Sequence, residues 1–350
     1  MSGIFHEWAP RFWAKGHSAI PVVVETKRPA VSNWSGFSFN LPKPETRANW
    51  LSTYALCSLG ICLGTPLSEA HVLFAVDVDD DLWVKPVRAL LGNCPCAKRG
   101  KKGQTIFVRA PMADRMKSTV IADHEKRQVV DILGPKKQTI LPPSLHPDTR
   151  AEYQWIGKSL LEISTSDELP EFGGTDLQAL KMLIRSEEAV GIIGGEATHD
   201  ASLRLSAKLV RVGLSDDRIT AIFESLLPDD YDGDSLEELP ELIASARQKG
   251  FGEIAQRTSS DPYVAGAIGP LPLGYAGNEF VFRHQQTREV VRRSGVQLIM
   301  PSGLFELASM TFWVSQFPKR NQKGDVYGID YISAGNALIQ ACRAVGGYRY

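Results

Sequence analysis

The apolar residues of this chain change their spacing near residue 175, and this change limits the fold to two differently built parts. Before it, apolar and β-branched residues form short continuous runs typical of buried strands. These runs lie at 20–24, 59–63, 72–78, 105–108, 129–133 and 139–141, and a short helix is predicted at 47–54. After it, Ile219, Ile222, Phe223 and Leu226 show the i, i+3, i+4, i+7 spacing of a helix. The sequence therefore predicts an α+β chain, a sheet domain followed by a bundle of about four helices over 175–250.

The rest of the chain is predicted to contain a linker and a further mixed segment. Residues 256–274 are rich in Ser, Gly and Pro, which favours a linker, and 275–350 return to strands and helices, ending in an apolar helix at 334–345. The predicted organisation is a sheet domain at 1–172, a helical module at 173–255, the linker, and a C-terminal α/β segment. A chain that is 43% hydrophobic and 23% charged is neither disordered nor fibrous.

Neither a membrane partner nor secretion is expected. The longest apolar runs have the length of a strand. The first residues do not show the basic segment followed by an apolar segment that is typical of a signal peptide. Five cysteines are scattered, and the pair Cys94 and Cys96 lacks the clean second pair of a zinc site. These features predict reduced thiols and a cytoplasmic protein.

The formal net charge of −1 conceals two oppositely charged segments. Residues 85–137 contain thirteen Lys and Arg against four Asp and Glu, whereas residues 160–245 contain six against nineteen. The near-neutral sum therefore does not exclude nucleic acid as a partner. We expect DNA and nucleotide to meet the basic segment, and the acidic segment to touch only a short stretch of template or a protein.

Three acidic residues stand on otherwise apolar strands. Asp77 and Asp79 are two apart, so they project from the same face at the end of their strand. Adjacent carboxylates repel unless a cation neutralises them, and hard cations such as Mg²⁺ or Mn²⁺ prefer oxygen ligands. Asp131 lies between apolar neighbours, where an isolated acid is costly without a partner. Because Asp80 and Asp81 follow directly, a plain acidic turn is the alternative to a metal site.

A basic cluster lies between the two acidic strands. Lys98, Arg99, Lys101 and Lys102 surround Gly100, which favours a loop that contacts phosphate. The alternative is an ordinary solvated loop. The position of the cluster between the acids favours the phosphate-binding interpretation.

In this order, these segments resemble the bifunctional primase-polymerase (prim-pol) domain of the archaeo-eukaryotic primase superfamily, which occurs in phage and plasmid replication proteins. The resemblance spans roughly residues 10–172 and is carried by several motifs together. They are Pro21, Lys27-Arg28-Pro29 and Trp34, then 59–64, Asp77-Val78-Asp79, the basic loop leading into 105–109, then 130–134, 141–147 and Tyr153-Gln154-Trp155. The resemblance implies an RNA-recognition-motif-like catalytic sheet and a two-metal site with Mg²⁺ or Mn²⁺.

The resemblance also implies the activity and its partners. A DNA primase/polymerase of a phage or plasmid would make primers and extend them on a single-stranded DNA template, with NTP or dNTP as substrates. A replicative helicase would be a further partner, because residues 275–350 faintly resemble the region that leads into one. The expected location is the bacterial or phage-infected cytoplasm.

The site residues follow from the same resemblance. The catalytic and metal-binding residues would be Asp77, Asp79 and Asp131. Nucleotide binding is assigned to Lys101, Lys102, Gln104, Arg109, Ser144 and His146. DNA binding is assigned to Lys98 and Arg99 and, in the helical module, to the stripe Arg204, Lys208 and Arg211.

One departure from the family pattern leaves other functions open. The family has a His on the strand after the basic loop, where it contacts the phosphates of the incoming nucleotide, but this strand reads Gly103-Gln104-Thr105. Lys101, Lys102 or Gln104 would replace it, or His146 from the next strand. The alternatives are a catalytically weakened replication-initiation or DNA-binding protein with this fold, and a metal-dependent nuclease that uses the same acids.

Two aromatic residues flank the predicted site. Trp83 and Phe107 are expected to be better candidates for base stacking than Trp34, Trp50 and Trp155, which are expected in the core.

Overall fold

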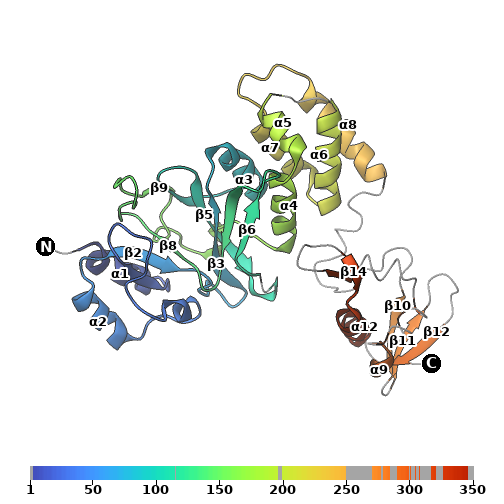
Figure 1. Ribbon diagram of the computed structural model, residues 1–350, viewed down its shortest axis with the longest axis horizontal. Helices are drawn as coiled ribbons and strands as arrows, with labels where there is room; N and C mark the ends of the chain where they lie inside the picture. Colours follow the sequence, from blue (N-terminus) through green and yellow to red (C-terminus); the bar gives the residue numbers. More distant parts are fainter. Residues whose placement is uncertain are drawn as a thin grey trace. The chain divides into compact units, whose positions relative to one another are not determined.

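The chain up to residue 168 of the computed structural model forms two antiparallel sheets, together with short helices (Figure 1). The larger sheet has the strand order β6-β7-β3-β5-β4-β9, and the smaller sheet has the order β1-β2-β8. The strands are β1 (Ala19–Val22), β2 (Ser58–Cys62), β3 (His71–Val78), β4 (Cys96–Arg99), β5 (Gln104–Pro111), β6 (Thr119–Ala122), β7 (Gln128–Leu133), β8 (Gln138–Ile140) and β9 (Gln154–Gly157). The helices are α1 (Ile4–Ala14), α2 (Pro44–Thr53) and α3 (Val84–Leu91), with single turns η1 (Trp34–Ser38), η2 (Asp81–Trp83), η3 (Met112–Asp114) and η4 (Ser166–Glu168).

The description covers most of the chain. It includes residues 3–114, 116–195, 199–249, 270–276, 279–283, 290–298, 300, 304, 307, 317–320 and 326–345. The chain divides into two compact units, Met1–Gly252 and Glu253–Tyr350. The boundary predicted at 255 and the linker predicted at 256–274 lie outside the described residues, apart from the last five of the linker, where β10 begins at Leu271.

All six predicted strands are present, and each begins or ends within about three residues of its predicted bounds. Strands β4, β6 and β9 were not expected from the sequence. In β4 the consecutive cations Lys98 and Arg99 are typical of a loop, yet the strand pairs with β5 on one side and β9 on the other. Backbone pairing on both sides thus overrides the weak strand propensity of charged residues.

The two faces of the larger sheet pack into two separate cores. Phe74 and Val76 of β3 belong to a core shared with helices, whereas Leu73 and Ala75 belong to a core shared with α1 and the smaller sheet. This follows from the strand geometry, because successive side chains point to opposite faces. The larger sheet is therefore covered on both faces.

Among the described residues between 174 and 249 there are five helices, one more than predicted. They are α4 (Gly174–Ile184), α5 (Glu187–Ile193), α6 (His199–Val212), α7 (Asp216–Leu226) and α8 (Ser235–Gln248). Their buried residues, such as Leu209 and Phe223, belong to the same core as Val76 and Ile106 of the sheet. The predicted boundary at residue 172 thus falls between two parts that share one hydrophobic core.

The second unit is smaller and also mixes strands with helices. It contains β10 (Leu271–Ala276), β11 (Glu279–Arg283), β12 (Val290–Ser294), α9 (Gly295–Leu298), β13 (Pro318–Arg320), β14 (Val326–Ile329) and α12 (Tyr331–Val345). Phe282, Leu298 and Leu338 are fully buried in its core. The α+β class predicted from the sequence is confirmed. Among the described residues, no helix combines the length and the apolar character that a membrane crossing requires.

A buried histidine makes the stability of the first unit depend on pH. His17 is 6% exposed, and no described group hydrogen-bonds to its Nδ1. Burial lowers the pKa of His17 to about 4, although a hydrogen bond with the backbone of Leu160 opposes the effect. Because the unfolded chain binds this proton near pH 6.5 and the folded chain does not, stability is lost as the pH falls from 6.5 to 4.

We predict that His17→Gln flattens this pH dependence. Between pH 7 and pH 4 the wild type should lose about 3 kcal/mol more than the variant in its free energy of unfolding. Denaturant titration at several pH values measures the difference, from which the carboxylates common to both proteins cancel. The matched control is His6→Gln, at an exposed position, which should keep the wild-type slope. Equal slopes for the wild type and His17→Gln would contradict the prediction.

Candidate functional site

One row of polar side chains crosses the larger sheet. Lys98 of β4 lies opposite Thr105 of β5, and Thr105 in turn lies opposite Asp77 of β3. Asp131 of β7 pairs with Asp77 from the other side. Residues directly opposite each other in antiparallel strands project from the same face of the sheet. The register therefore gathers a lysine, a hydroxyl and two carboxylates on one face.

This row lies where a dry core ends. Two residues back along the strands, Ala75 pairs with Phe107 and with Leu133, and all three are buried. Since residues two apart share a face, this face changes from apolar to polar at Asp77. Charges beside a dry core are less screened than charges at an open surface.

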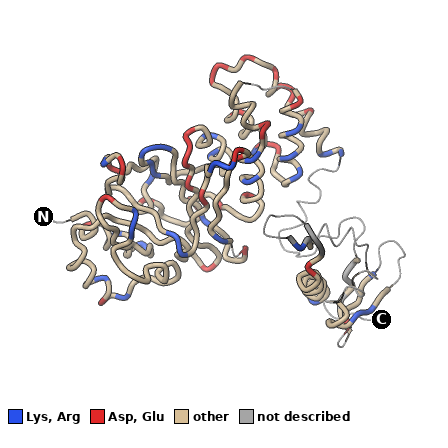
Figure 2. The backbone as a smooth tube through the Cα atoms, in the orientation of Figure 1, with Lys and Arg blue, Asp and Glu red and all other residues tan. Residues whose placement is uncertain are grey.

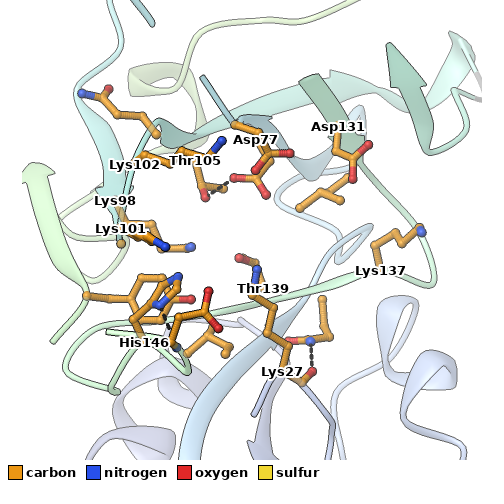
Figure 3. Close-up of a pocket in the computed structure, with 18 residues that line it drawn as sticks. Lys27, Asp77, Lys98, Lys101, Lys102, Thr105, Asp131, Lys137, Thr139 and His146 are labelled. Atoms are coloured by element: carbon orange, nitrogen blue, oxygen red, sulfur yellow. Dashed lines mark hydrogen bonds between the residues drawn. The ribbon is translucent and has the colours of Figure 1, made fainter. Parts of the chain in front are cut away.

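A cavity of about 430 Å³ opens over the polar row (Figure 3). Its other wall comes from the smaller sheet and the segments around it, with Lys27, Thr139, His146 and Tyr153 among the lining residues. Five lysines line the cavity: Lys27, Lys98, Lys101, Lys102 and Lys137. The cavity thus has carboxylates at one side and a cationic lining around them.

Three of the carboxylates that line the cavity, those of Asp77, Asp79 and Asp131, repel one another. Burial first, and then the charges of Asp77 and Asp131, raise the pKa of Asp79. Burial and the charge of Asp77 likewise raise the pKa of Asp131. The Oδ1 atom of Asp131 is buried, and no described group donates a hydrogen bond to it. Only Asp77 has a neutral partner in the row, because Thr105 Oγ1 donates to its Oδ1 at 2.5 Å.

These properties fit a divalent cation. Mg²⁺ and Mn²⁺ prefer carboxylate oxygens, and a cation would relieve the repulsion and pair with the free Oδ1 of Asp131. In the described part of the chain, no three His, Cys, Asp or Glu side chains stand close enough to enclose a single ion. The fit therefore rests on the charge balance of Asp77, Asp79 and Asp131 and not on a complete ligand cage.

Lys98 lines the cavity from strand β4, so its predicted place in a loop is wrong, whereas its assignment to DNA binding stays a prediction. The strand β4 extends through Arg99, and the loop begins only at Gly100. Lys98 is 4% exposed, and its Nζ lies 4.6 Å from the centroid of the Tyr153 ring. Burial lowers the pKa of Lys98 to about 8, although the charge of Asp77 opposes the effect.

The loop after β4 is fixed by a glycine. Gly103 has a φ of +62°, and a Cβ at this position would lie 1.8 Å from the carbonyl oxygen of Val78. Its N–H donates to Asp81 Oδ1. Only glycine permits this approach to the end of β3. The approach brings the exposed residues Lys101 and Lys102 to the cavity. Their assignment to nucleotide binding stays a prediction.

His146 also lines the cavity. Its ring lies 5.3 Å from the Tyr153 ring, centroid to centroid, and the backbone N–H of Asp148 donates to its Nδ1 at 3.2 Å. Burial, followed by the charge of Lys27, lowers the pKa of His146. A neutral imidazole that accepts at Nδ1 carries its proton on Nε2. His146 can therefore donate one hydrogen bond to a ligand.

Two residues predicted to bind nucleotide do not line the cavity. Arg109 lies toward the other end of β5, where it pairs with Asp167 and with Glu171. Ser144 is fully buried, and its Oγ accepts a hydrogen bond from the backbone N–H of Leu59 at 2.8 Å. Both residues therefore have structural partners away from the ligand-sized space.

Two further predicted residues are already paired within the protein. Gln104 lines the cavity, but its Oε1 accepts a hydrogen bond from Arg88. Arg99 forms an ion pair with Asp81 at 3.0 Å, and its side chain is 40% exposed. Arg99 thus lies at the surface beside the cavity and is not part of its lining.

The basic stripe of the helical module lies on α6, away from the cavity lining. Arg204 and Arg211 are exposed, whereas Lys208 forms an ion pair with Glu188 of α5. Figure 2 shows Lys and Arg on this helix, and Asp and Glu along the loop between α7 and α8.

The base-stacking prediction for Trp83 and Phe107 is wrong. Trp83 is 2% exposed and packs in the core beneath the helices, and Phe107 is fully buried in the other core. Both residues are close to the acids in the sequence, but their side chains are enclosed in hydrophobic cores and do not line the cavity.

Some lining residues were not predicted as site residues. Lys27, Lys137, Thr139 and Tyr153 reach the cavity from segments distant in sequence from Asp77. No local spacing pattern connects them to the acids. Thr105 was named only as part of the strand that lacks the family's histidine. In the structure its hydroxyl contacts Asp77 directly.

We predict that Asp131→Asn stabilises the protein when divalent cations are absent. Removing one of three mutually repelling carboxylates should raise the free energy of unfolding at pH 7 by about 1 kcal/mol, after allowance for solvent screening. Denaturant unfolding in the presence of a chelator measures the change. The control is Asp148→Asn, an exposed carboxylate of the same cavity, which should shift stability by less than about 0.5 kcal/mol. A lower stability for Asp131→Asn would contradict the prediction.

Comparison with known proteins gives one family match. Residues 9–172 match the family model described as "Bifunctional DNA primase/polymerase, N-terminal". No curated protein matches the chain. The matched range begins within α1 and ends just before α4, so it contains both sheets and every lining residue of the cavity.

Proposed function

Residues 9–172 form a domain of the bifunctional DNA primase/polymerase family, and from this premise we propose that the chain makes primers and extends them on single-stranded DNA. The observation that carries the proposal is the cavity, whose lining combines the carboxylates of Asp77, Asp79 and Asp131 with five lysines. This arrangement suits a substrate that brings both divalent cations and a triphosphate. The proposal includes a phage or plasmid origin, a replicative helicase as partner, and NTP or dNTP as substrate.

Asp77, Asp79 and Asp131 would hold Mg²⁺ or Mn²⁺. Supporting observations are the raised pKa values of Asp79 and Asp131 and the unpaired Oδ1 of Asp131. Bound there, two such ions would supply activation of the attacking hydroxyl and neutralisation of the leaving pyrophosphate. The hydrogen bond from Thr105 would hold the carboxylate of Asp77 in one orientation.

The lysines of the cavity would bind the triphosphate and the template. Four of them, Lys27, Lys101, Lys102 and Lys137, are exposed and can follow a ligand as it enters. In the reaction, the 3′-hydroxyl of the primer forms a bond to the α-phosphorus of the nucleotide, and the bond to pyrophosphate breaks. Cationic side chains around the leaving group stabilise the charge that develops on it.

The threonine at position 105 keeps two other functions open to test. The strand on which this family has a histidine contains none here, and its Thr105 hydroxyl is already bonded to Asp77. A weakened enzyme that binds DNA for replication initiation would incorporate no nucleotide. A nuclease would shorten the DNA.

We predict metal-dependent extension by the wild type on primed and on unprimed single-stranded templates. Asp77→Ala/Asp79→Ala should lower the rate by about 10³-fold, since metal-site carboxylates contribute several kcal/mol to the barrier. Gel analysis separates longer products, shorter products and unchanged DNA. Asp217→Ala, an exposed site on α7, should behave like the wild type. If the wild type and the double variant are equally inactive with Mg²⁺ and Mn²⁺, the polymerase proposal is lost.

Metal binding is predicted to be visible without any reaction. Mn²⁺ at about one hundred times its Kd should stabilise the wild type by about 2.7 kcal/mol. Asp77→Asn/Asp79→Asn should show little of this gain. Thermal unfolding with and without the ion measures both, and an equal shift in the two proteins would place the ion elsewhere.

A further inference from the structure

Lys98 is a buried cation that lies against the ring of Tyr153. Among the described residues no carboxylate forms an ion pair with it, and no group accepts a hydrogen bond from its Nζ. Its Nζ makes a cation–π contact with the ring of Tyr153, at 4.6 Å from the ring centroid. A buried ammonium group is costly unless it is paired, and a ring face offsets only part of that cost. The described residues therefore offer no acceptor to the three N–H donors of Lys98. A ligand in the cavity can supply one.

The other lysines of the cavity differ from Lys98 in their exposure. Lys27, Lys101, Lys102 and Lys137 are all exposed, whereas Lys98 is 4% exposed. Water and salt screen the charge of an exposed lysine, but much less that of a buried one. Per residue, Lys98 should therefore interact most strongly with an anion in the cavity. Figure 3 shows Lys98 at the wall beside Thr105 and facing the same space as His146.

The hydroxyl next to Lys98 is not available for the same task. Thr105 has one O–H donor, and this donor is committed to Asp77 Oδ1. In the polar row the next donor away from the carboxylates is Lys98, directly opposite Thr105. The strand register thus places the Lys98 cation one strand away from Thr105 and two strands away from Asp77. A triphosphate whose α-phosphate lies at the carboxylates would place its outer phosphates toward such a group.

We propose that Lys98 binds the outer phosphates of the incoming nucleoside triphosphate, with Tyr153 as the surface that shields this contact from water. The inference rests on the proposed function and deepens it, because it assigns to β4 the phosphate contact for which the sequence offers no histidine on β5. Burial leaves the pKa of Lys98 at about 8, so the charged form still predominates at pH 7. The phosphate bound there would in turn favour that form.

The test is equilibrium binding of ATP and dATP to the full chain, without template. Titration calorimetry with Mg²⁺ present compares adenosine tri-, di- and monophosphate. The wild type should bind the triphosphate more tightly than the monophosphate. Lys98→Gln should weaken triphosphate binding at least tenfold and change monophosphate binding less than threefold. Lys98→Arg, which keeps the charge, should recover part of the loss.

Two comparison variants separate this contact from general electrostatics. Lys101→Gln removes an exposed charge of the same cavity and should weaken triphosphate binding only two- to threefold. Lys117→Gln removes an exposed charge outside the cavity lining and should have no effect. Thermal unfolding without nucleotide checks the fold. Lys98→Gln should be as stable as the wild type or more stable, because it removes a buried unpaired charge.

The outcomes distinguish failure of this inference from failure of the proposed function. If the wild type binds nucleotide and Lys98→Gln binds the triphosphate equally well, the inference is overturned and the proposed function stands. If Lys98→Gln loses mono- and triphosphate affinity alike, Lys98 has a structural role and the inference is also overturned. If its affinity for single-stranded DNA falls and its triphosphate affinity does not, the phosphate it binds belongs to DNA. If the wild type binds no nucleotide, the proposed function fails and the inference with it.

Discussion

The candidate site depends on the antiparallel register of β3 with its two neighbours. That register sets Asp77 opposite Thr105 on one side and opposite Asp131 on the other. A slip of one residue in either pairing would turn the polar side chains into the helical core and bring apolar ones to the cavity. The register is held by the apolar residues on both faces of the sheet, because each face has its own core. Hydrophobic packing thus fixes a group of charges that would not assemble by themselves.

The charged groups of the cavity destabilise the folded protein. Burial and mutual repulsion raise the pKa values of Asp79 and Asp131, and burial lowers that of Lys98. Each shift means that the charged form is less stable in the folded protein than in water. In the polar row Thr105 stands between Asp77 and Lys98, and its hydroxyl donates to Asp77. An arrangement of this kind suits a ligand that carries both cations and phosphates.

The helical bundle is more closely joined to the sheets than its separate spacing pattern indicated. Leu209 and Phe223 share a core with Val76 and Ile106, so this bundle contributes to the stability of the sheet that carries the site. Its acidic surface, seen in Figure 2 along the α7–α8 loop, nonetheless differs in charge from the cavity side. The basic segment 85–137 and the acidic segment 160–245 thus lie in one compact unit, where their charges partly offset each other.

The order of the amino acids was enough to predict the strands with apolar runs, the helices with regular spacing, and the acids Asp77, Asp79 and Asp131. These signals are local, because a strand or helix period is visible within a few residues and an acid between apolar residues stands out. The sequence could not place Lys98, since two consecutive cations are typical of a loop and only pairing with β5 and β9 makes them a strand. It also misplaced Trp83, because which face a side chain occupies depends on packing. Tertiary structure alone brought Lys27 and Tyr153 to the acids, because contacts between distant segments leave no spacing pattern in one sequence.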